Sequence, residues 1–194
     1  YWLEGQRTNF TFNWSSAGKS ANMPFQAPLV SADVKLSVGG EEFTVSSPVV
    51  YRYADQIRGE IRRDVNVVPL VTNALESNLA IIPASAKAQK QRVVMSVTNN
   101  SPKAVSGTAK LDLPAGWTSS PASSDFSLKG RGEKTAVTFD VTVPANAKTG
   151  AYKILAKSVV GGKDYAQTVY EVAYPHIQTH RRYTPSELDA KVVD

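Results

Sequence analysis

The clearest pattern in this chain of 194 residues is alternation of apolar and polar positions with a period of two. The stretch AVTFDVTVP places Val137, Phe139 and Val141 on one face and polar residues on the other. Such alternation is typical of a strand with one face on a core and the other in solvent. GTAKLDLP and RRDVNVVP repeat it, and long helical periodicity is missing. The pattern predicts an all-β protein.

About seven strand-like segments lie between Leu79 and Tyr174, separated by turn residues. Paired glycines, Gly39-Gly40 and Gly161-Gly162, are suited to tight hairpins because glycine accepts a positive φ. Seven short strands in about 100 residues are typical of an immunoglobulin-like sandwich. We expect such a domain over residues 78–175.

The first 77 residues contain about five further strand-like segments, preceded by a stretch rich in Ser and Pro. We expect a smaller β-sandwich over residues 1–77, incomplete if its first strands precede Tyr1. The fold prediction is therefore two tandem immunoglobulin-like β-sandwich domains. Because the sequence begins at Tyr1, without an initiator Met or a leader segment, we expect it to be a piece of a larger protein.

Residues 176–194 are predicted to be an exit linker with a short helix. The sequence TPSE has the form of a capping box, with Thr184 as the cap, Pro185 at the first helical position and Glu187 reaching back to the cap amide.

Composition excludes several classes of protein. Hydrophobic residues make up 42% and charged residues 20%, and no apolar run reaches the roughly 20 residues of a membrane span. The net charge of +5 is spread along the chain among acidic residues, which indicates a solvated surface and not a nucleic-acid interface. The absence of cysteine excludes disulfides, thiolate metal sites and a cysteine nucleophile.

The segment YPHIQTHRRY holds both histidines of the chain, His176 and His180. A hydrolytic zinc site usually takes three protein ligands, and the third would have to be a distant residue such as Glu171 or Asp189. We therefore predict no metal and no cofactor, and keep His176 and His180 as the pair that a metal would use.

Arg181 and Arg182 follow the histidines and could bind a phosphate or a sugar acid through bidentate hydrogen bonds. We favour a solvated strand end that contacts a neighbouring domain. Tryptophan offers a flat face on which a sugar ring can stack, and Trp14 and Trp117 are the candidate carbohydrate-binding residues. Trp117 lies in a Gly-Trp turn that we expect to cover one end of its own sandwich, so Trp14 is the better candidate.

LPAGWTSSP and FSLKGRGEKTAVTFDVTVPANAKTGAYKI resemble the sandwich module found beside catalytic domains in bacterial alpha-galactosidases and other carbohydrate-active enzymes. The first half, with YWLEG, MPFQAPLV and GEIRRDVNVVP, resembles the region after the catalytic domain of large bacterial PIG-L/LmbE-like proteins. That resemblance implies a zinc-dependent N-acetylglucosamine deacetylase as parent, and a periplasmic or extracellular location.

The family's Ala-His-Pro-Asp-Asp metal-binding stretch is missing here, and the serines lack a glycine-flanked nucleophile elbow. No catalytic residue is therefore assigned. We expect a non-catalytic accessory or scaffold module that positions a catalytic domain, with neighbouring domains of the parent chain as partners. The chief alternative is a carbohydrate-binding module that uses exposed aromatic residues, and a hydrolase is the weakest reading.

Overall fold

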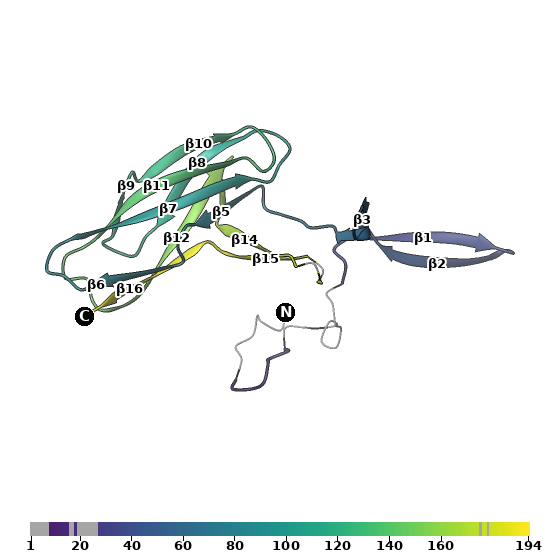
Figure 1. Ribbon diagram of the computed structural model, residues 1–194, viewed down its shortest axis with the longest axis horizontal. Coiled ribbons are helices and arrows are strands. Elements are labelled where there is room, and N and C mark those ends of the chain that lie inside the picture. The colour runs from purple at the N-terminus through teal and green to yellow at the C-terminus, as the bar shows by residue number, and fades with distance from the viewer. Residues whose placement is uncertain (1–7, 16–17, 19–26, 175, 178) are drawn as a thin grey trace. The chain divides into compact units, whose positions relative to one another are not determined.

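The computed structural model describes residues 8–15, 18, 27–174, 176–177 and 179–194, and the elements in these residues are all strands (Figure 1). The predicted all-β class is thus confirmed. The chain divides into two compact units, Tyr1–Val67 and Val68–Asp194. No helix of the described residues is long and apolar enough to cross a membrane.

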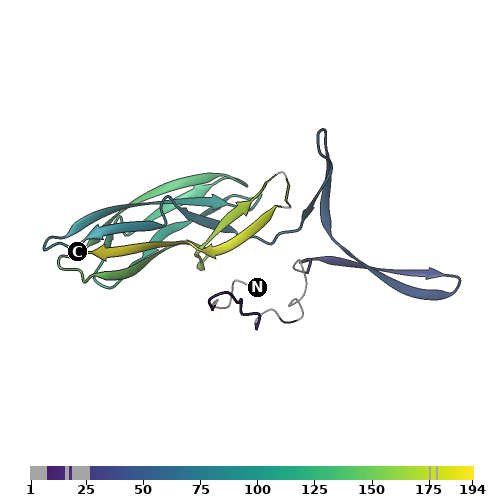
Figure 2. The ribbon, with the colours of Figure 1, turned by 60° about the horizontal axis from the view of Figure 1, so that its bottom comes forward.

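The second unit is a sandwich of two sheets (Figures 1 and 2). One sheet has the order β5-β7-β11-β9, with bounds Val71–Leu75, Gln89–Asn99, Lys134–Val143 and Thr118–Ser120. The other has the order β10-β8-β12-β16-β6, with bounds Ser123–Leu128, Val105–Asp112, Gly150–Val160, Glu187–Val193 and Leu79–Pro83. The short strand β13 (Lys163–Tyr165) pairs with β12. Strands β16 and β6 are parallel, and the other paired neighbours in these two sheets are antiparallel.

The core lies between the two sheets and is built from the inward positions of the alternating strands. In β11, Val137, Phe139, Val141 and Val143 are buried while the residues between them are exposed or half-buried. Burial of such side chains contributes about 1.5–3 kcal/mol each, which is what holds the sheets together. The remaining core comes mainly from β7, β8, β12 and β16 and includes Val93, Met95, Val97, Ala109, Leu111, Ile154, Ala156, Leu188, Ala190 and Val192.

A buried polar link also joins the sheets. The Ser158 hydroxyl on β12 donates to Asn73 Oδ1 on β5 at 2.6 Å, and Asn73 Nδ2 donates to the Tyr165 carbonyl at 2.6 Å. Ser158 and Asn73 are fully buried, so each needs the other to replace lost water. This link fixes the position of β5 against the opposite sheet.

The C-terminal end differs from the sequence prediction of an exit linker with a short helix over 176–194. Residues 180–193 form β15 (His180–Pro185) and β16, and β16 lies inside its sheet between β12 and β6. The physical reason is that Leu188, Ala190 and Val192 alternate inward and complete the core. Pairing with two strands outweighs the local capping signal of TPSE.

The boundary between the units also differs, falling after residue 67 instead of residue 77. Strand β5 begins at Val71, pairs with β7 and contributes Val71 to the core. The ten residues before the predicted boundary thus belong to the sandwich.

The described residues of the first unit form two hairpins and not the smaller sandwich that the sequence predicts. Strand β1 (Ser31–Val38) pairs with β2 (Glu41–Pro48), and β3 (Val50–Asp55) pairs with β4 (Gly59–Asp64). Gly39 and Gly40 make the β1–β2 turn with φ of 64° and 90°, as their pairing predicts. Every residue of β1 and β2 is exposed, because each of these sheets has only two strands.

Candidate functional site

A hairpin also projects from the sandwich, between β13 and β16 (Figures 1 and 2). After β13, strand β14 (Gln167–Val172) runs out and β15 returns, paired in antiparallel register. After β15 the chain returns to the sandwich and continues as β16. The described residues of YPHIQTHRRY therefore lie at the tip and in the returning strand of this hairpin, which we call the ribbon, and not in a linker.

Cross-strand register gives the ribbon two faces. Tyr170 lies opposite Arg182 and Val172 opposite His180, so these four side chains share one face. All four are exposed, with Tyr170 at 54% and Val172 at 36%. We call this set the ribbon face.

The side chains on the opposite face of the ribbon form an ion pair or are half-buried. Arg181 Nη2 lies 2.6 Å from Glu171 Oε2, and the two residues are direct cross-strand partners. Tyr183 and its partner Val169 are half-buried, and burial raises the pKa of the Tyr183 hydroxyl. The negative charge of Glu171, the acidic residue of the ribbon, is thus paired with Arg181 on the side away from the ribbon face.

The tip continues the aromatic character of the ribbon face. Tyr174 is 60% exposed, and its ring stacks on the His176 ring with centroids 5.9 Å apart and an interplanar angle of 27°. Ile177 beside them is also exposed. The ribbon therefore presents three exposed rings, from Tyr170, Tyr174 and His176, besides the imidazole of His180.

The structure places the two histidines of the metal hypothesis at the tip and at the first residue of β15. The described residues contain no group of three or more His, Cys, Asp or Glu that could hold a metal ion. Both suggested third ligands have cationic neighbours instead. Glu171 pairs with Arg181, and Asp189 Oδ1 lies 3.9 Å from Lys153 Nζ.

Trp117 is wrong as a carbohydrate-binding candidate because its side chain is in the core. It is 6% exposed and packs on Tyr152 with ring centroids 5.2 Å apart. A ring without a free face cannot stack on a sugar. Its burial agrees with the expectation, from the Gly-Trp turn, that Trp117 packs on its own sandwich.

Trp14 lies in the first unit and is 44% exposed. Its role as a carbohydrate-binding residue stays a prediction.

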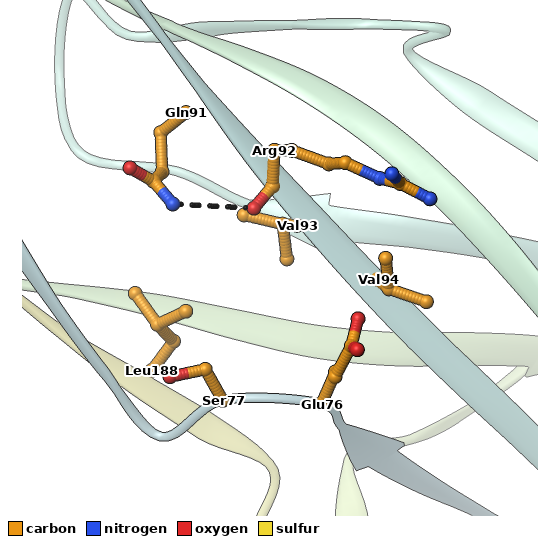
Figure 3. Close-up of a pocket in the computed structure, with 7 residues that line it drawn as sticks. All are labelled: Glu76, Ser77, Gln91, Arg92, Val93, Val94 and Leu188. Carbon is orange, nitrogen blue, oxygen red and sulfur yellow. Dashed lines mark hydrogen bonds between the residues drawn. The ribbon is translucent and has the colours of Figure 1, made fainter.

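A small pocket opens between the sheets near the β5–β6 turn (Figure 3). Glu76 and Ser77 come from this turn, Val93 and Val94 from β7, and Leu188 from β16. Its volume of about 80 Å³ is enough for a few water molecules, whereas small-molecule sites usually measure at least about 300 Å³. The ribbon is therefore the stronger candidate site.

The residue types of this segment single out its arginines and histidines as candidate site residues, but not Tyr170 or Tyr174. Alternation alone could have grouped Tyr170 with Val172. It could not pair Tyr170 with Arg182, because that pairing depends on a turn of unknown length.

Solved structures similar to this chain include a periplasmic chaperone and a PapD-like domain. The periplasmic chaperone SfaE is 18% identical, with 62% of this chain and 56% of that chain covered and a TM-score of 0.33. The seventh PapD-like domain of human CEP192 is 13% identical, with 66% and 91% covered and a TM-score of 0.33. The match thus spans little more than half the length of SfaE.

A family 123 glycoside hydrolase from Clostridium perfringens is 8% identical, with 65% of this chain but 27% of the enzyme covered and a TM-score of 0.36. No curated protein matches the sequence.

A family model gives the most specific comparison. Residues 85–159, from just before β7 to the end of β12, match the NPCBM-associated NEW3 domain of alpha-galactosidase. The sequence prediction of an alpha-galactosidase-associated module in the second half is thereby confirmed. The part of the sandwich from β7 to β12 is therefore similar to an accessory domain associated with alpha-galactosidase.

Proposed function

We propose that this chain is a scaffold module that positions the catalytic domain of a larger carbohydrate-active protein relative to its neighbours. The observation that carries the proposal is the NEW3 match at residues 85–159, within a sandwich whose core is closed by both sheets. A module of this kind contributes rigidity and spacing.

The packing supports such a role. Interiors packed with interlocking apolar side chains resist deformation. The buried Ser158–Asn73 hydrogen bond adds a directional link between the sheets. A spacer built in this way keeps its two ends at a fixed separation, whereas a flexible linker does not.

For the parent protein, we propose an exported bacterial deacetylase of the PIG-L/LmbE-like type. The support is the resemblance of the first half, in YWLEG, MPFQAPLV and GEIRRDVNVVP. The test is the sequence of the full-length parent. An Ala-His-Pro-Asp-Asp stretch upstream of Tyr1 would support this parent, and a different catalytic domain there would refute it.

The scaffold role is tested in the parent chain by replacing residues 68–194 with a flexible Gly/Ser linker. We expect kcat/KM on a polymeric substrate to fall about tenfold or more, with little change on a small soluble substrate, because only the polymer needs the domains held in place. Equal activity of both proteins on the polymer would contradict the scaffold role. Deacetylation of N-acetylglucosamine substrates by the isolated chain would contradict its non-catalytic character.

A further inference from the structure

We propose that the ribbon face, together with Tyr174 and His176 at the tip, binds a polysaccharide that carries carboxylate groups. This site is separate from the scaffold role and depends on neither the parent enzyme nor its reaction. Its residues are Tyr170, Val172, His180 and Arg182 on the strands, and the stacked pair at the tip.

The exposed rings suit a saccharide. Tyr170 and Tyr174 are both more than half exposed, and an aromatic ring offers an apolar face with a polar edge. In extended chain, four residues span about 13 Å, so the two rings would meet different parts of an oligosaccharide lying along the ribbon. Val172 between them adds an apolar contact.

The charges on the same face select an acidic ligand. Arg182 lies directly opposite Tyr170, and a guanidinium can bind a carboxylate through two parallel hydrogen bonds. The acidic residue of the ribbon, Glu171, is on the other face and pairs with Arg181. A carboxylate that approaches Arg182 therefore meets no carboxylate among the ribbon's side chains on that face.

The size of the site favours a polysaccharide over a protein. Stable protein interfaces bury about 800 Å² on each partner and use roughly 20–30 residues a side. The ribbon face has four residues and the tip adds a few more. A polysaccharide needs only a narrow line of contacts, which is the shape of one face of a two-stranded ribbon.

The proposal is tested by calorimetric titration of the chain with oligogalacturonate at low salt. We expect saturable binding that weakens at least tenfold in Tyr170→Ala and in Arg182→Ala. Tyr51→Ala and Arg131→Ala are matched controls, since both residues are exposed and lie elsewhere in the chain, and should bind as the unchanged protein does. Tyr170→Phe keeps the ring and should retain most of the affinity, as a check that loss in Tyr170→Ala is not loss of folding.

The ligand class is tested with two further probes. Neutral galactan should bind at least tenfold more weakly, and equal binding would overturn the role of Arg182 in selecting carboxylates. Polyglutamate should also bind weakly, and equal binding would show charge attraction without saccharide recognition. No saturable binding of oligogalacturonate, or full binding by Tyr170→Ala and Arg182→Ala, would overturn the proposal.

Discussion

The β1–β2 hairpin of the first unit and strand β11 of the sandwich carry the same alternation but have opposite environments. In the hairpin, Val34 pairs with Val45 and Leu36 with Phe43, which gives one apolar face. All four of these side chains are more than 40% exposed. In β11, the equivalent inward residues lie under a second sheet and are buried.

This difference shows what a period of two can establish. It identifies a strand and divides its residues between two faces, and it does so correctly in both regions. Burial requires a second layer, which other segments of the chain must supply. A two-stranded sheet without that layer is marginal in stability. The comparison can be tested by substitutions, because matched residues exist in and outside the sandwich.

The largest effect is expected from Phe139→Ala in β11. Phe139 is 0% exposed, and truncation of a buried Phe costs about 3–5 kcal/mol through lost burial and the cavity left behind. Phe43→Ala in β2 is the matched control; because Phe43 is 46% exposed, it should cost less than about 1 kcal/mol. Urea unfolding of both variants measures this, and equal losses would show that the β1–β2 face is covered in solution.

Gly107→Ala should have the next largest effect. A Cβ at this position of β8 would lie 2.3 Å from the Val159 carbonyl oxygen and 3.0 Å from Phe126 Cζ. Since the backbone of β12 must shift to relieve the overlap, we expect a loss of about 1–3 kcal/mol or more. Gly130→Ala is the control, with no atom within 4 Å of the added carbon. Thermal unfolding that does not distinguish the two variants would argue against the close approach of β8 and β12.

Ser158→Ala removes the donor to Asn73 Oδ1 in the link between the sheets. Because the amide oxygen is then buried without a partner, we expect a loss of about 1–3 kcal/mol in urea unfolding. Ser106→Ala removes an exposed hydrogen bond to Ser127 and should cost less than about 0.5 kcal/mol. If Ser158→Ala lost as little stability as Ser106→Ala, a water molecule would be replacing the Ser158 hydroxyl as the partner of Asn73.

The smallest effect is expected from Lys157→Met on the outer face of the sandwich. Lys157 Nζ lies 2.7 Å from Asp112 Oδ2 and 3.0 Å from Asp164 Oδ2. These hydrogen bonds raise the pKa of Lys157, and the bond from Lys157 lowers the pKa of Asp164. We expect a small fall in Tm at neutral pH, because both carboxylates are about half exposed and ion pairs with solvent-exposed partners contribute little.

The Tm difference between the unchanged protein and Lys157→Met should depend on pH. A carboxyl with a lowered pKa stabilises the fold above its unfolded value and loses that contribution as pH falls through the folded value. The Tm difference between the unchanged protein and Lys157→Met should therefore shrink in acid, below the ordinary carboxyl value of 3.8. Lys129→Met, in the β10–β11 turn, is the control. A difference that stays constant in acid would exclude the ion pairs as its cause.

The sequence predicts the sandwich well where the alternation within a single strand shows which of its faces is buried. Val137, Phe139 and Val141 alternate strictly, and the predicted buried face is the observed one. It predicts poorly where the outcome depends on a distant partner. Thr184, Pro185 and Glu187 have the order of a helix cap, yet Glu187 begins a strand that pairs with β12.

The missed strand did carry a signal. Leu188, Ala190 and Val192 alternate with Asp189 and Lys191, which is the pattern that identified the other strands. At the candidate site, residue types drew attention to His176, His180 and the arginines. The ribbon that places Arg182 opposite Tyr170 is a product of pairing and could not be read from spacing alone.

The parallel pairing of β6 and β16 has a mechanical consequence. The two strands run side by side in the same direction over five paired positions, from Leu79 with Asp189 to Pro83 with Val193. Tension applied at Leu79 and Val193 pulls on opposite ends of the pair, so it shears all of the hydrogen bonds together instead of opening them one after another. Under such a load this strand pair would therefore separate abruptly at a high force, and would keep its register below that force.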